Sequence, residues 1–188
     1  MRCGLNQRQY VNPIDVSGFA RNSSGWDMVA GVSLDLGGIT TAEAFVGYFK
    51  QNYVGFPPLE GPQFGLTAYW NPLKDLLVKP YVRRTINEAA YVGDSGYLNT
   101  SMGFDVNYKL LPNVRLDGRA DYTIADYQSF SSANAQYDQY VAFSAGAMYM
   151  PISEFFIGPT YQYIHRNSNQ PNNNYGQNVI MLRLGARL

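Results

Sequence analysis

Hydrophobic and polar residues alternate along most of the chain, and the alternation is strictest over residues 98–110. There Met102 and Phe104 belong to one set of alternate positions, while Asp105 and Lys109 belong to the other. Side chains two residues apart point to the same face of a β-strand, so this segment is predicted to be a strand with one apolar and one polar face. Such a strand fits a half-buried sheet in a soluble protein, and it equally fits a wall between lipid and water.

The same alternation recurs in nine segments, which we expect to form nine strands, and residues 3–11 are a weak candidate for a tenth. Three similar turns contain a proline, and these prolines are 40 and then 39 residues apart: WNPLKDLL at 70–77, LLPNVRL at 110–116 and MPISEFF at 150–156. Each period holds two alternating segments. A propeller blade would need four strands in each period, so the repeat predicts antiparallel hairpins.

Two classes of connection alternate between the predicted strands. Short turns (GG, NPLKD, LPN and PISE) alternate with longer segments at about 54–61, 88–97, 128–138 and 167–177. Long strands with short turns at one end and longer loops at the other are typical of outer-membrane barrels, whose turns are periplasmic and whose loops are extracellular. The predicted fold class is therefore all-β: an antiparallel, up-and-down transmembrane β-barrel of ten strands, nine clear and one weak.

Composition favours the membrane barrel over a soluble sheet. Only 15% of the 188 residues are charged, against roughly 25% in ordinary soluble domains. No apolar run approaches the length of about 20 residues that a membrane-spanning helix needs. A soluble β-sandwich or a lipocalin-like barrel remains the alternative class, but it would have to bury the apolar face of every strand in one core without an evident helix to cover it.

Aromatic residues are concentrated near the ends of the predicted strands. Because tyrosine and tryptophan favour both interfaces of a membrane, we expect two aromatic girdles on the lipid-facing side. The residues near the short turns are Trp70, Tyr108, Tyr149 and Phe155, and those near the longer segments are Tyr53, Tyr97, Tyr127, Tyr137, Tyr163 and Tyr175.

Length, charge and cysteine content narrow the functional classes further. The length suits one domain over residues 1–188, with a partly irregular start at 1–24. The formal net charge is zero, so no long-range field would attract nucleic acid. The single cysteine, Cys3, excludes an internal disulfide and a multi-cysteine metal site, and no cofactor is expected. The start, MRCGLNQRQY, lacks the apolar stretch of a secretory signal.

Several stretches resemble the β-barrel porin family of the second type, which is often associated with exopolysaccharide production. The resemblance rests on GWDMVAGVSLDL, AFVGYFKQNY, LTAYWNP, YLNTSMGFDVNYKLLPNV, ADYTIADYQ and NVIMLRLGARL, and it runs from about residue 10 to the end. It implies a non-enzymatic channel, or an accessory component of polysaccharide export, in the outer membrane of a Gram-negative bacterium. Its expected partners are the lipid bilayer with lipopolysaccharide, and polysaccharide or small polar solutes.

The resemblance also bears on the size of the barrel. Members of the family are longer, so the chain resembles the C-terminal half of such a barrel. Its strands would then either close alone or form part of a larger barrel. An even number of strands is expected where both termini are periplasmic, which makes the weak strand at residues 3–11 decisive.

Charged residues in the polar set are candidates for lining the lumen. If the hairpin is symmetric about Pro112, Asp105 faces Arg119 and Asn107 faces Asp117. These charges either neutralise one another and fill the lumen, or bind polar solutes and saccharides. Tyr69, Tyr81 and Tyr140 belong to the same face. The lumen-lining candidates are Asp105, Lys109, Arg115, Asp117, Arg119, Asp121, Arg183 and Arg187.

No catalytic or metal site is predicted from the residue types. His165 is the only histidine and lies near the outer end of a strand, in YIHRNS, with Asn167 and Ser168 close in sequence. An outer-membrane hydrolase would need acidic and nucleophilic partners beside it in space. A histidine close to a loop is the simpler interpretation. Three alternatives to the channel therefore stay open: a structural or surface barrel plugged by its own charges, the hydrolase, and the soluble sandwich.

Overall fold

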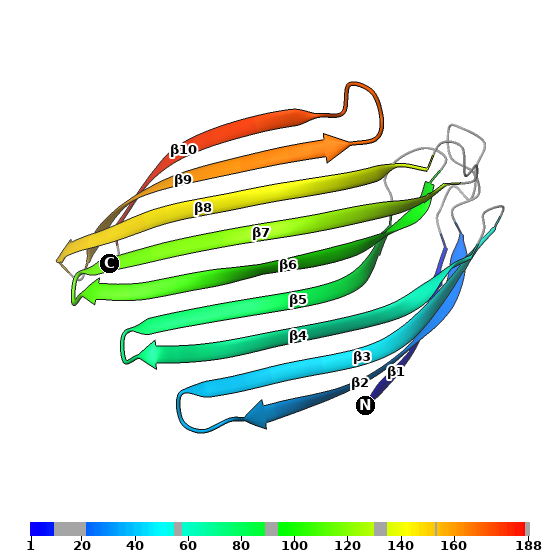
Figure 1. Ribbon diagram of the computed structural model, residues 1–188, viewed down its shortest axis with the longest axis horizontal. Helices are drawn as coiled ribbons and strands as arrows, with labels where there is room; N and C mark the ends of the chain where they lie inside the picture. Colours follow the sequence, from blue (N-terminus) through cyan, green and yellow to red (C-terminus); the bar gives the residue numbers. More distant parts are fainter. Residues whose placement is uncertain (10–21, 55–57, 89–93, 130–134, 153, 187–188) are drawn as a thin grey trace.

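The computed structural model is a single antiparallel sheet of ten strands in sequence order (Figure 1). It describes residues 1–9, 22–54, 58–88, 94–129, 135–152 and 154–186. No helix among them is long and apolar enough to cross a membrane. The strands are β1 (Arg2–Arg8), β2 (Ser23–Asp35), β3 (Thr40–Tyr53), β4 (Leu59–Leu73), β5 (Leu76–Glu88), β6 (Asp94–Leu111), β7 (Val114–Ser129), β8 (Tyr137–Ile152), β9 (Phe155–Ser168) and β10 (Tyr175–Ala186).

The weak tenth strand of the sequence is present. It is β1, which pairs with β2 from Ser23 to Val29. Among the described residues, the rest of β2, as far as Asp35, pairs only with β3. The predicted strand reached residue 11, and residues 10 and 11 lie outside the described part of the chain. The prediction of ten up-and-down antiparallel strands is confirmed.

The connections follow the predicted alternation, with short turns at one end of the sheet and longer connections at the other (Figure 1). The strands are longer than the alternation indicated, because β6 already begins at Asp94, inside the segment 88–97 that was predicted to be a loop. Glu88 still pairs with Gly96 there. Backbone pairing is indifferent to side-chain polarity, so the ladder continues where the alternation stops.

The register places all the apolar sets on one face of the sheet. Val82 on β5 faces Leu66 on one side and Met102 on the other. Met102 in turn faces Tyr122. The face that carries these residues is called the outer face here, and the opposite face, which carries Asp105 and the other polar residues, is called the inner face.

The outer face exposes large apolar side chains that a soluble protein would bury. On the outer face Val46 is 66% exposed and Phe104 is 46% exposed, whereas Ser101 and Asp138 on the inner face are 5% and 0% exposed. An apolar surface that continues across a whole sheet is not stable against water. The outer face therefore requires an apolar environment, which favours the wall between lipid and water over the soluble sandwich.

One part of the outer set is covered by the protein itself. Pairing between β4 and β5 begins only at Phe64, so the two strands are not paired near the longer connections. There Phe49 and Leu59, from the inner face, form a small core with Leu98, which is 8% exposed. Leu98 belongs to the apolar set of residues 98–110, and unlike Met102 and Phe104 of the same set it is covered by the protein itself. A contact between strands that are not paired leaves no trace in local alternation.

The aromatic girdle near the short turns is confirmed, but the second girdle is only partly present. Trp70, Tyr149 and Phe155 are exposed on the outer face. Near the longer connections, Tyr97 and Tyr127 instead point inward and stack with their ring centroids 4.8 Å apart. They do so because both occupy positions of the polar set. Of the six tyrosines predicted there, Tyr53, Tyr97, Tyr127 and Tyr175 lie on the inner face, and Tyr137 and Tyr163 lie on the outer face.

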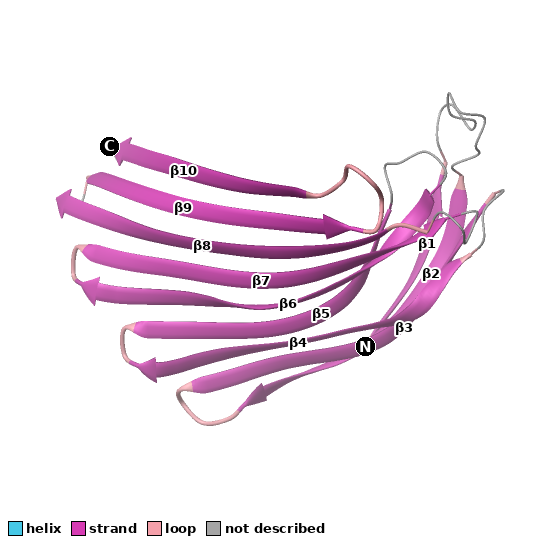
Figure 2. Ribbon diagram, turned by 45° about the horizontal axis from the view of Figure 1, so that its top comes forward, coloured by secondary structure: helices cyan, strands magenta, loops and turns pink. Residues whose placement is uncertain are grey.

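The described sheet is curved but not closed (Figure 2). Within the described residues β1 pairs only with β2, and β10 pairs only with β9. These two strands are the edges of the sheet, and with ten strands they run antiparallel to each other.

A charge introduced on the outer face should destabilise the protein in lipid far more than one on the inner face. We expect Phe104→Arg to lower the free energy of unfolding by about 2–4 kcal/mol, the cost of an arginine at mid-depth on a lipid-facing strand. The control Asn107→Lys lies on the inner face opposite Asp117 and should change it by less than about 1 kcal/mol. Denaturant titration in phospholipid vesicles measures both, and equal effects would contradict the assignment of the faces.

Candidate functional site

The predicted lumen-lining residues gather on the inner face. The symmetry about Pro112 is confirmed, since Asp105 pairs with Arg119 and Asn107 pairs with Asp117. Arg183 lies on the inner face of β10, and Arg187 lies outside the described residues. The remaining candidates come from the β6–β7 hairpin: Asp105, Lys109, Arg115, Asp117, Arg119 and Asp121.

A charged cluster spans β5, β6 and β7 at the middle of the inner face. The Lys79 ammonium lies 2.7 Å from Asp105, and the Arg119 guanidinium lies 3.6 Å from the same carboxylate. Arg119 also donates two hydrogen bonds to Asp121, from Nε at 2.5 Å and from Nη2 at 3.0 Å. Its Nη2 donates a third to the Tyr81 hydroxyl at 3.1 Å. Two cations and two carboxylates therefore share one site.

The cluster neutralises its own charge. The carboxylates are the more buried members, with 18% of the Asp105 side chain and 15% of the Asp121 side chain exposed, while 52% of Arg119 is exposed. Paired charges at an interface with water interact more strongly than fully exposed ones. For these residues the geometry favours the mutually neutralising network of the two interpretations. Lys79 was not among the candidates, although alternation placed it on the polar face.

Gly103 provides the space that this cluster needs. A Cβ atom at this position would collide with the backbone carbonyl of Ala120. It would also lie 3.0 Å from the Tyr81 hydroxyl and 3.1 Å from the Asp121 carboxylate. A side chain here would therefore displace the hydroxyl and the carboxylate that Arg119 binds.

A second polar cluster lies at the end with the longer connections. Asp138 is fully buried and accepts hydrogen bonds from Arg166 at 2.7 Å, from Gln136 at 2.7 Å and, more weakly, from the Tyr140 hydroxyl at 3.4 Å. The Arg166 guanidinium also lies 5.6 Å from the centre of the Tyr140 ring. Sequence reasoning missed Asp138, because 128–138 was assigned to a loop. Asp138 lies two residues before Tyr140, which belongs to the polar set, and this spacing could have placed Asp138 on the inner face.

A groove on the inner face shows how tightly the first strands curl. It has a volume of about 550 Å³ and is lined from β1 by Arg2 and Asn6, and from β5 by Thr85 and Asn87. On a flat sheet strands four apart would be about 19 Å from each other. Since β1 and β5 line the same groove, the sheet bends round to form a concave inner wall.

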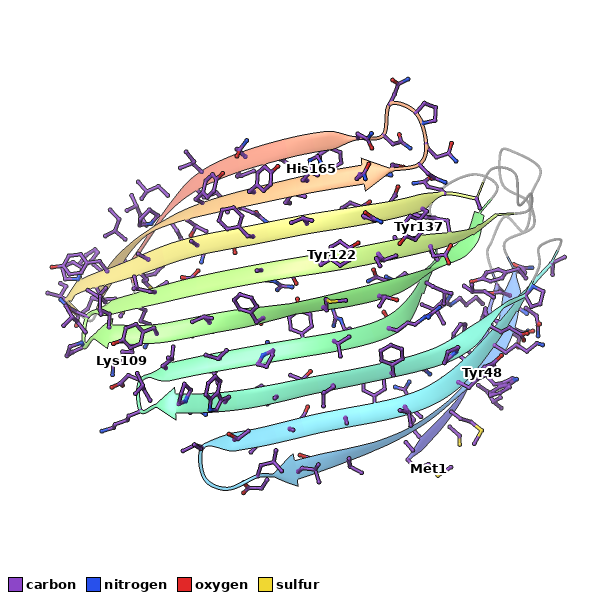
Figure 3. The ribbon with its side chains drawn as sticks, in the orientation of Figure 1. Met1, Tyr48, Lys109, Tyr122, Tyr137 and His165 are labelled. Atoms are coloured by element: carbon purple, nitrogen blue, oxygen red, sulfur yellow. The ribbon has the colours of Figure 1, made fainter. Side chains whose placement is uncertain are left out.

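Among the described residues, His165 forms no hydrogen bond or ion pair that would suit a catalytic arrangement. It is exposed on the outer face, where its cross-strand neighbours are Val141 and Gly176 (Figure 3). Ser168 lies on the inner face, three positions along the same strand. Among the described residues no group of three or more histidine, cysteine, aspartate or glutamate side chains could hold a metal ion.

An apolar outer face, a charged inner face and up-and-down antiparallel strands define the wall of a membrane-embedded β-barrel of the porin class. The family described as "Putative beta-barrel porin 2" matches residues 1–188, and the chain belongs to this family. The resemblance seen from about residue 10 is thereby confirmed and extends to the first residue. No curated protein matches the chain.

Removing the buried carboxylate should weaken the end of the sheet near the longer connections. We expect Asp138→Ala to lower the free energy of unfolding by about 3–5 kcal/mol, because Arg166, with only 12% of its side chain exposed, keeps a buried charge while losing its carboxylate. Denaturant titration in lipid vesicles measures the loss.

The matched control is Glu43→Gln, on the inner face of β3. Glu43 is exposed and forms no ion pair within the described residues, so its change should stay within about 0.5 kcal/mol. Similar losses in the two variants would show that Asp138 has no special structural role.

Proposed function

We propose that the chain forms the wall of a channel in the outer membrane of a Gram-negative bacterium, and that polar solutes cross the membrane along its inner face. One observation carries the proposal: a charged inner face lies back to back with an outer face that only lipid suits. A lumen lined by charges holds water, and water-filled barrels conduct. Membership of a porin family supports the same role, which is non-enzymatic.

The alternative is a structural or surface barrel plugged by its own side chains. The neutral cluster around Arg119 would suit a plug. Against it, the inner face keeps two grooves, of about 550 Å³ beside β1 and about 470 Å³ near the short turns. Both grooves offer room for water and small solutes along the inner face, so we favour the channel.

The solute we propose is a saccharide, and the role a channel or accessory in polysaccharide export. Hydroxyl-rich ligands are recognised by alternating donors and acceptors with an aromatic surface beside them. The groove beside β1 offers such a set, with Asn6, Gln51, Gln63 and Asn87 beside Tyr53. The export role itself rests on the resemblance to the family.

The proposal requires the sheet to close. Unpaired backbone groups cost several kcal/mol each in lipid, so neither edge strand is stable there alone. We propose that β1 pairs with β10, either within one chain or between two copies of it. Their antiparallel directions allow this pairing without a further strand.

The channel proposal predicts electrical conductance. The chain is refolded in detergent, checked for a heat-modifiable band that marks a closed barrel, and added to a planar lipid bilayer. We expect stepwise, ion-conducting openings. A heat-modifiable protein that stays silent would contradict the channel and favour the plugged barrel.

Cys3 makes the proposed closure measurable. It is exposed and lies on the outer set of the edge strand β1. Single cysteines at outer positions of β10, Asn178→Cys, Ile180→Cys and Leu182→Cys, would bring the two sulfurs within disulfide range if the strands pair. We expect one of the three to oxidise to a disulfide, and non-reducing gels distinguish a bond within one chain from a bond that doubles the mass.

The inward-facing control is Val179→Cys, which lies between two of these positions but on the inner face. It should stay reduced, because its side chain and Cys3 would point to opposite faces. No disulfide at any of the three outer positions would show that β1 and β10 are not neighbours and that other strands complete the wall.

A further inference from the structure

Two cations face each other at the end of the inner face that carries the short turns. Lys109 on β6 and Arg115 on β7 are direct cross-strand partners, on either side of the turn at Pro112. Lys109 is labelled in Figure 3. Side chains in such pairs have Cβ atoms about 4.5–5.5 Å apart, and like charges in this position destabilise a sheet. The sequence keeps the pair despite this cost.

The other cations near this hairpin have carboxylate partners. Lys79 and Arg119 each lie within 4 Å of a carboxylate, as described above. Within the described residues neither Lys109 nor Arg115 has a carboxylate at that distance. The next residue across from Arg115 is Met148, which is uncharged.

The backbone holds the pair in place beside the next turn. The Lys109 N–H donates to the carbonyl of Asp75 at 2.8 Å, which fixes the β4–β5 turn against the end of β6. This turn brings Lys74 to the same place. The local arrangement is therefore set by main-chain bonds and does not depend on the charges.

Both cations line a groove of about 470 Å³. Its charged lining consists of three bases and two acids, and Leu77 and Met148 add apolar surface. The acids, Asp75 and Asp117, form no ion pair with Lys109 or Arg115 within the described residues. The groove thus has room for a small ligand and an excess of positive charge.

We propose that Lys109 and Arg115 form a binding site for an anionic group, a carboxylate or a phosphate, carried by a solute that passes along the inner face. An anion between the two side chains would replace their repulsion by two attractions. The planar guanidinium suits two oxygens of one carboxylate or phosphate, and the ammonium supplies a further donor. This inference rests on the proposed channel, and it adds that the solute is negatively charged or carries a negative group.

Binding is measured first, on the full chain folded in a nonionic, phosphate-free detergent. Titration calorimetry with glucuronate, a carboxylated sugar, and separately with inorganic phosphate should show saturable binding that weakens as salt rises. Lys109→Gln combined with Arg115→Gln should weaken it at least tenfold. Arg115→Lys, which keeps the charge but loses the planar pair of donors, should give an intermediate affinity.

The matched control is Lys50→Gln. Lys50 belongs to the outer set and lies 2.7 Å from Glu60, so its loss should leave the affinity unchanged. Equal affinity in the wild type and the double variant would overturn the site. So would an equal loss in Lys50→Gln, because that would indicate an effect of net charge alone.

Two further experiments identify the source of the anion and test the anion site separately from the channel. If the protein binds vesicles of anionic lipid but neither glucuronate nor phosphate, the site binds a lipid headgroup, and the proposed solute site is overturned. In a bilayer with a salt gradient, the double variant should shift the reversal potential towards cation selectivity. If the protein binds the anion but never conducts, the channel is refuted and the anion site stands. If it conducts but binds no anion, and the double variant does not alter its selectivity, the anion site is refuted and the channel stands.

Discussion

The register of the strand ladder is the constraint on which the other features depend. Because side chains alternate with a period of two, a slip of one residue between neighbouring strands would move a whole apolar set to the inner face. The pairing of Val82 with both Leu66 and Met102 shows that the register is kept across consecutive strands. Tight turns such as the one at Pro112 fix it locally, since a short connection leaves few ways to pair the strands it joins. The two opposite faces, and hence any lumen, follow from this pairing.

Much of this architecture could be predicted from the sequence because alternation and turn position are local. The residue pairs of the β6–β7 hairpin follow from the position of Pro112 in the turn. The pairing of Asp105 with Arg119 could therefore be predicted from the sequence alone. Two features that escaped prediction depend on contacts between segments that are distant in the sequence. Leu98 is buried because β3 and β4 reach it across an unpaired seam. The Asp138–Arg166 pair joins the ends of two strands, and Asp138 lies in the segment 128–138 that was assigned to a loop.

The inner face changes in electrostatic character along the strands. Near the longer connections, one oxygen of the fully buried Asp138 carboxylate accepts hydrogen bonds from three donors, and the other has no partner among the described residues. In the middle, the cluster around Arg119 is neutral and partly exposed. Near the short turns, Lys109 and Arg115 remain without carboxylate partners among the described residues. Two cations without a carboxylate partner therefore lie side by side at the short-turn end of the inner face, although the protein as a whole has no net charge.

The two edge strands explain why the sheet needs to close in a membrane. Leucines of the outer set on interior strands are partly shielded by a neighbour on each side: Leu66 is 49% exposed and Leu116 is 37% exposed. On β10 the same residue type is more exposed, with Leu182 at 62% and Leu184 at 68%. The difference reflects the absence of a second neighbouring strand within the described residues. Lipid could cover these side chains, but it cannot satisfy the N–H and C=O groups of the strand that carries them. Only another strand meets both needs, so the inner face becomes a lumen when β10 acquires a partner.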